Sequence, residues 1–130
     1  MKLFLKNIFF FLTGGALYSL LEILWRGKSH PSMFAVGGFC FLVLLDISKL
    51  NIPLLIKSVI GCLAITVTEF FCGIIINRVL LLDVWDYSSV PFNLMGQICL
   101  SYSAIWLLLS FIVIYASNKY YEYIKNLNKS

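Results

Sequence analysis

Four long apolar runs constrain the fold of this chain more than any other feature. They cover residues 8–24, 33–47, 54–76 and 98–116. A helix needs about 20 predominantly apolar residues to cross the hydrocarbon core of a bilayer, so the shorter runs need their flanks to complete a span. The chain is 61% hydrophobic and only 12% charged, far from the composition of a soluble domain. A soluble fold of 130 residues could not bury so much apolar surface, which makes lipid the expected solvent.

The expected fold class is therefore all-α, a polytopic transmembrane bundle of four helices. A segment that crosses a bilayer must satisfy its own backbone hydrogen bonds, and a helix does so. We expect a single integral membrane domain over residues 1–130. Its helices are expected over residues 8–26, 32–48, 54–78 and 93–118, with a polar C-terminal tail over 117–130.

The connection between the third and fourth helices, residues 79–93, is too long and too apolar for a simple turn. Pro91 and the neighbouring serines argue against a fifth span. We expect an interfacial or re-entrant segment, with Trp85 and Tyr87 at the level of the lipid headgroups.

The basic residues predict the orientation. Four spans place seven of them on the side that carries both termini: Lys2, Lys6, Lys49, Lys57, Lys119, Lys125 and Lys129. The other three are Arg26, Lys28 and Arg78. The excess predicts a cell-membrane protein with its N- and C-termini in the cytoplasm. The basic residues flank the apolar runs and form no stripe, so the expected partner is the lipid bilayer and not nucleic acid.

Polar residues recur at intervals of four along three of the expected helices, which places each set on one helix face. The sets are Tyr18, Glu22 and Arg26; Glu69, Gly73 and Asn77; and Asn93, Gln97 and Ser101, provided that the fourth helix starts near Asn93. All three lie toward the expected outer ends of the helices. An ionisable residue inside a span is a functional hypothesis by default, so the sets predict a polar pocket in the outer half of the bundle.

The candidate ligand-binding residues are these polar groups and their neighbours in the outer loops. They are Tyr18, Glu22, Trp25, Arg26, His30, Glu69, Asn77, Arg78, Trp85, Asp86, Tyr87, Asn93 and Gln97. Structural alternatives stay open for each. Glu22 with Arg26, and Glu69 with Arg78, are also suited to neutralise one another. The aromatic residues are also typical interfacial anchors, and His30 is also an ordinary loop residue.

The sequence predicts no catalytic residue, metal or cofactor. It has one histidine, and its four cysteines lie inside apolar runs without the spacing of zinc ligands. No nucleophile elbow and no arrangement of serine, histidine and acid is recognisable. We therefore do not expect an enzyme.

Several short motifs resemble those of a known membrane protein family. In order they are residues 18–27 (YSLLEILWRG), Ser32-Met33-Phe34, Gly37-Gly38, residues 66–70 (TVTEF) with Gly73 and Asn77, residues 85–88 (WDYS), Pro91-Phe92-Asn93 and Gly96-Gln97-Ile98. Across about residues 14 to 110 the chain resembles the ABC-transporter permease family of the CmpB type. That resemblance implies a transporter or permease-type membrane component.

The expected function is binding of a polar small molecule, an ion or a lipid headgroup in the outer pocket. Two alternatives stay open: a membrane-embedded enzyme that acts on a lipid substrate, and a non-catalytic scaffold or regulatory subunit of a membrane complex. The sequence lacks the phosphate-binding GxxxxGK[ST] motif, so an ATPase would belong to another chain. Four helices are few for a transport pathway, so we expect a homo-oligomer or a larger membrane partner.

The orientation is testable by cysteine accessibility. In Lys28→Cys and Lys125→Cys variants, an impermeant thiol reagent applied to intact cells should label position 28 and leave position 125 unlabelled. Labelling of position 125 alone would reverse the orientation and move the predicted pocket to the cytoplasmic side.

Overall fold

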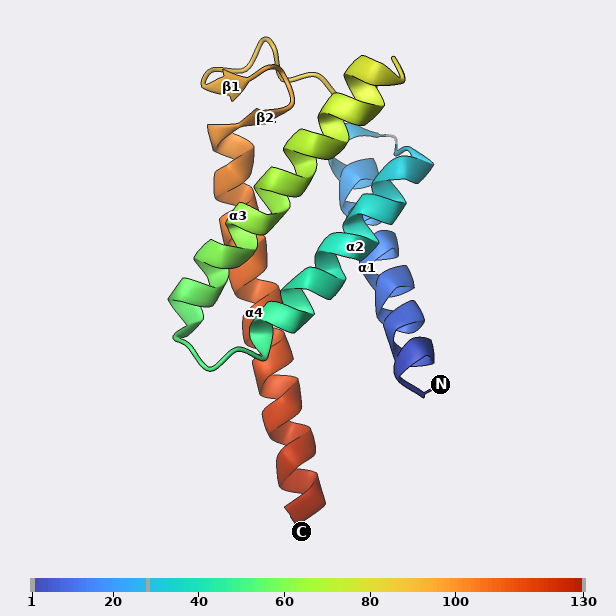
Figure 1. The fold of residues 1–130 in the computed structure, drawn as a ribbon. Helices are drawn as coiled ribbons and strands as arrows, with labels where there is room; N and C mark the ends of the chain where they lie inside the picture. Colours follow the sequence, from blue (N-terminus) through green and yellow to red (C-terminus); the bar gives the residue numbers. More distant parts are fainter. Residues whose placement is uncertain (1, 28, 130) are drawn as a thin grey trace.

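The computed structural model describes residues 2–27 and 29–129, and 77% of it is helical. Figure 1 shows four long helices: α1 (Lys2–Arg26), α2 (Pro31–Ser48), α3 (Leu54–Gly73) and α4 (Leu100–Lys129). All four are long and apolar enough to cross a membrane. The predicted all-α membrane fold with four helices is confirmed.

The helices form two closely packed pairs, α1 with α2 and α3 with α4, and α2 joins the pairs by contacting both α3 and α4. Within the described residues, α1 makes no comparable contact with α3 or α4. The α1–α2 loop and the α3–α4 connection lie at one end of the bundle, which we call the hairpin end (Figure 1). The α2–α3 loop and the C-terminus lie at the other.

Glycines set the close approach of α1 and α2. A Cβ atom added at Gly38 would lie 2.6 Å from the backbone oxygen of Phe11, and one at Gly37 would lie 2.5 Å from the Cβ of Tyr18. A Cβ at Gly15 would lie 2.7 Å from Phe34. Small residues let membrane helices approach until their backbones nearly touch, since lipid provides no hydrophobic drive for association.

A buried lysine holds the end of the bundle opposite the hairpin. The Lys57 ammonium donates a hydrogen bond to the backbone oxygen of Ser48, 2.9 Å away, at the C-terminus of α2. A cation there satisfies an unpaired carbonyl and opposes the helix dipole. The Ser48 hydroxyl also lies 2.9 Å from that of Ser117, which ties α2 to α4.

Regular α-helix ends at the C-terminus of α3. A π-helical turn, η1 (Ile74–Val79), continues the helix, and an irregular segment then leads to a short hairpin of β1 (Asn93–Leu94) and β2 (Ile98–Cys99). The strands are antiparallel, with Asn93 opposite Cys99 and Leu94 opposite Ile98. We call residues 80–99 the hairpin segment; it folds over the end of α3 and α4 (Figure 1).

Three expected helix boundaries differ from the structure. The fourth helix begins at Leu100, so the expected start at Asn93 is wrong. The Asn93 side chain instead closes a turn: its amide donates to the Val90 oxygen at 2.8 Å and its oxygen accepts from the Gly96 N–H at 3.1 Å. Gly96 has φ +74°, which a helix excludes. Helix α1 begins at Lys2 and not near residue 8, and the C-terminal tail is helical to Lys129.

The packing of α1 on α2 predicts the effect of a larger residue at Gly38. Gly38→Ile should destabilise the protein by about 1–3 kcal/mol or prevent its folding, because its side chain meets backbone of the neighbouring helix. Ala35→Ile on the exposed face of α2 is the control. Thermal unfolding in detergent, followed by circular dichroism, measures both. Equal stability of the two variants would contradict the packing.

Candidate functional site

A buried carboxylate on α3 lies near the hairpin end of the bundle. Glu69 is only 5% exposed. One of its oxygens accepts a hydrogen bond from the Tyr87 hydroxyl at 3.0 Å, and the other accepts one from the Trp106 indole N–H at 2.8 Å. Both oxygens therefore act as acceptors. The two donors come from the hairpin segment and from α4, so Glu69 joins three parts of the chain.

Two stacked aromatic pairs extend from this carboxylate. Tyr87 stacks on Tyr102 of α4, with ring centroids 4.7 Å apart and planes inclined by 12°. Trp106 stacks on Tyr18 of α1, with centroids 5.8 Å apart and planes inclined by 26°. The second pair brings α1 to α4 although these helices do not pack along their lengths. Two aromatic rings, those of Tyr87 and Trp106, therefore lie beside the acid.

Two cavities lie beside the Tyr18–Trp106 stack. One, of about 280 Å³, is lined by Glu69 and by residues of α1, α2 and α4, and we call it the Glu69 cavity. The other, of about 190 Å³, is lined by Glu22, Tyr87 and Tyr102, and we call it the Glu22 cavity. Their walls share four residues: Tyr18, Leu21, Trp106 and Leu109. The two acidic groups therefore line neighbouring spaces that share the Tyr18–Trp106 stack as a wall.

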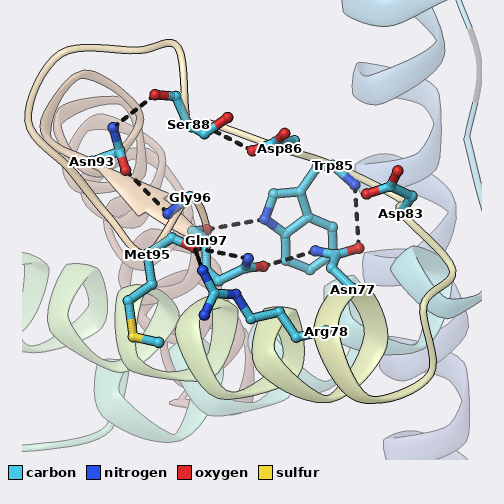
Figure 2. Close-up of a pocket in the computed structure, with 10 residues that line it drawn as sticks. All are labelled: Asn77, Arg78, Asp83, Trp85, Asp86, Ser88, Asn93, Met95, Gly96 and Gln97. Atoms are coloured by element: carbon cyan, nitrogen blue, oxygen red, sulfur yellow. Dashed lines mark hydrogen bonds between the residues drawn. The ribbon is translucent and has the colours of Figure 1, made fainter.

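A second polar group lies under the hairpin (Figure 2). The Asn77 side chain, in η1, donates to the Gln97 side-chain oxygen at 2.9 Å and accepts from the Val84 N–H at 2.7 Å. The Trp85 indole donates to the Gln97 backbone oxygen at 2.9 Å. A Cβ at Gly73 would lie 2.5 Å from the Gln97 side chain, so only glycine leaves room for this contact. These bonds hold the hairpin segment on the end of α3.

A polar cavity of about 400 Å³ adjoins these bonds, and we call it the hairpin cavity. Six predicted residues line it: Asn77, Arg78, Trp85, Asp86, Asn93 and Gln97. Arg78 is exposed and donates to the Met95 backbone oxygen at 3.2 Å.

Asp86 is an exposed acid at the edge of the hairpin cavity. The Ser88 backbone N–H donates to it at 2.8 Å. Hydrogen bonds from the Ser88 backbone and side chain lower the pKa of Asp86 below its ordinary value of 3.8, and the charge of Arg78 acts in the same direction. A lowered pKa means that this turn is stabilised above pH 3.8 and loses that contribution as the pH falls further.

The structure divides the predicted site residues into two groups, where the sequence predicted one pocket. Tyr18, Glu22, Glu69 and Tyr87 line the Glu69 and Glu22 cavities, and the six residues named above line the hairpin cavity. The expected polar row from Asn93 through Gln97 to Ser101 does not form, because that stretch is a hairpin. Trp85 and Tyr87 are each 5% exposed, so both rings pack against the protein, and their depth in the membrane stays a prediction.

His30 joins neither group. His30 is the N-cap of α2, and its ring nitrogen accepts from the Ser32 N–H at 3.1 Å. The side chains of Trp25 and Arg26 lie outside the described part of the structure. An ion pair of Glu22 with Arg26 therefore stays a prediction. Among the described residues, no group of three or more histidine, cysteine or acidic side chains is placed to hold a metal.

Sequence reasoning missed Trp106 and Tyr102. Trp106 is 8% exposed and donates to the central carboxylate, and Tyr102 stacks on the other donor. One signal was present: Trp106 falls in the middle of the fourth apolar run. Tryptophan usually lies near the ends of a span, and a buried indole N–H needs an acceptor.

The bonds of Asn77 predict the behaviour of the hairpin segment. Asn77→Leu leaves the Val84 N–H and the Gln97 side chain without these partners, at a cost of about 1–3 kcal/mol each. Deuterium exchange of residues 83–97 should rise several-fold, with α1 unchanged. Asn51→Leu in the exposed α2–α3 loop is the control. Unchanged exchange in Asn77→Leu would show that other contacts hold the segment.

Comparison with known proteins identifies the family. The model of the family described as "Putative ABC-transporter type IV", of the CmpB type, matches residues 26–130. No curated protein and no solved structure matches the chain. The matched range contains Glu69, the hairpin segment and α4, and it covers most of the chain. With four membrane-spanning helices and this match, the chain belongs to the CmpB-type ABC-transporter family and is a transporter-like membrane protein.

Proposed function

We propose that this chain is a membrane-embedded component of a transporter, and that it binds its solute in the Glu69 and Glu22 cavities. The observation that carries the proposal is the Glu69 carboxylate, which is 5% exposed, fixed by two hydrogen bonds and still borders a cavity of about 280 Å³. The family to which the chain belongs supports a role in transport.

A purely structural role explains this arrangement less well. Burying a carboxylate costs several kcal/mol, and well-packed apolar residues usually stabilise a core as well or better. A structural acid would be packed closely by its neighbours. Glu69 instead borders open space, and Glu22 borders a second space next to it. Acidic groups kept inside a span at that cost are typical of solute and ion pathways.

The hairpin segment connects the site to the surface of the bundle. Tyr87 of this segment donates to Glu69, while Trp85, two residues earlier, borders the hairpin cavity. A solute that replaces the Tyr87 hydroxyl at the carboxylate would free the segment from the site. Such a coupling is what a transporter needs, because occupancy must change the conformation that gives access.

The energy source would lie on another chain. The sequence has no GxxxxGK[ST] motif, and the family match to an ABC-transporter type supports the use of a nucleotide-hydrolysing partner. Four helices are few for a complete transport pathway, so further copies of the chain or other membrane subunits would form the rest of it.

Replacement of Glu69 tests the proposal. In host cells from which the gene has been deleted, restoring the wild-type chain should change the distribution of at least one solute between cells and medium, measured by untargeted mass spectrometry. Glu69→Gln should abolish that change, because it removes the charge while keeping the size of the side chain.

Glu122→Gln is the matched control, because Glu122 is exposed and pairs with Lys119 near the C-terminal end of α4. It should behave as wild type. A solute change that Glu69→Gln retains in full, or no solute change on restoring the wild-type chain, would contradict the proposal.

A further inference from the structure

The Glu69 and Glu22 cavities are each lined by an acidic side chain. Among their described lining residues, Glu69 and Glu22 are the charged ones. Glu22 is 8% exposed, and no hydrogen bond or ion pair joins it to any residue in the described part of the chain. Both described ion pairs, Lys49 with Asp46 and Lys119 with Glu122, lie away from the hairpin end. A buried carboxylate facing open space favours a cation as its neighbour.

The uncharged residues that line the Glu22 cavity indicate which kind of cation would bind. The aromatic rings of Tyr18, Tyr87, Tyr102 and Trp106 border the Glu22 cavity, and aliphatic side chains complete it. Ring faces attract organic ammonium-type cations, and tryptophan does so most strongly. A hard metal ion needs six or more oxygen ligands or a retained water shell, which apolar walls do not provide. The lining therefore fits a weakly hydrated organic cation.

Apolar space continues from the site toward the other end of the bundle. A further cavity of about 480 Å³ lies between α1, α2 and α4 and is lined by aromatic and aliphatic side chains. It shares Leu17, Phe41 and Val113 with the Glu69 cavity. Because α1 and α4 do not pack along their lengths, this apolar space follows the gap between them. It gives room for hydrocarbon groups beside the acidic site.

We infer that the Glu69 and Glu22 cavities bind a lipophilic organic cation, with its charged centre between the two carboxylates and its hydrocarbon groups on the aromatic and aliphatic walls. This inference rests on the proposed function and names the class of solute. It disfavours a phospholipid, because a phosphate group near the ammonium of such a headgroup would lie beside two acids with no described basic side chain in the walls.

Two ions of the same shape and opposite charge test the inference. The purified protein in a non-ionic detergent is dialysed against tetraphenylphosphonium or against tetraphenylborate. The wild-type protein should bind the phosphonium saturably and bind tetraphenylborate at least about tenfold more weakly, since one such factor corresponds to 1.4 kcal/mol. The two ions have nearly the same size and shape, so the comparison tests the sign of the charge.

Variants locate the site. Glu69→Gln and Glu22→Gln should each weaken phosphonium binding about tenfold or more, because each removes a charge that faces the cation in a medium of low dielectric constant. Glu122→Gln should bind as wild type does. Circular dichroism melting curves of the variants separate lost binding from lost folding, and only variants that melt cooperatively are compared.

Equal binding of the two ions by the wild-type protein, or phosphonium binding that survives replacement of both acids, would overturn the inference. If the wild type binds no phosphonium while Glu69→Gln still abolishes solute redistribution in cells, the class of solute is wrong and the proposed function stands. If the phosphonium binds as predicted and no solute depends on Glu69 in cells, the cation site is right and the proposed transport function is wrong.

Discussion

The hydrogen bonds that hold the Glu69 carboxylate are the interaction on which the site depends. A charged acid inside a membrane-spanning helix is costly unless donors replace the water it has lost. The Trp106 indole and the Tyr87 hydroxyl supply these donors from α4 and from the hairpin segment. The same bonds orient both rings for stacking on Tyr18 and Tyr102. One acid therefore sets the positions of the aromatic residues around the cavities.

The hairpin segment links this acid to the end of the bundle. Trp85 and Tyr87 lie two residues apart and are both buried, yet they belong to different cavities. Asn77 and Gln97 hold the Trp85 side of the segment, and Glu69 holds the Tyr87 side. The hairpin segment therefore lies between the hairpin cavity and the Glu69 and Glu22 cavities, and residues at each cavity hold it by hydrogen bonds. Trp85, Asp86 and Tyr87 form the direct covalent connection between the two sides.

The four helices could be predicted because lipid imposes a simple requirement of length and hydropathy on each span. Glu22 and Glu69 could be singled out for a related reason, since acids are rare where water is absent. The course of residues 80–99 could not be predicted. It depends on side-chain bonds of Asn77 and Asn93 and on the positive φ of Gly96, which no periodic pattern reveals. Trp106 was overlooked because its role appears only once α3 and α4 are paired.

Solid-state nuclear magnetic resonance measures the contact between Glu69 and Trp106 directly in lipid bilayers. A rotational-echo double-resonance experiment between the ¹³C-labelled Glu69 carboxyl carbon and the ¹⁵N-labelled indole nitrogen of Trp106 reports their distance. The hydrogen bond of 2.8 Å between indole nitrogen and carboxylate oxygen predicts strong dephasing of the carboxyl signal, absent in Trp106→Phe. Dephasing no greater than in Trp106→Phe would show that the indole does not hold the acid, and would contradict the account.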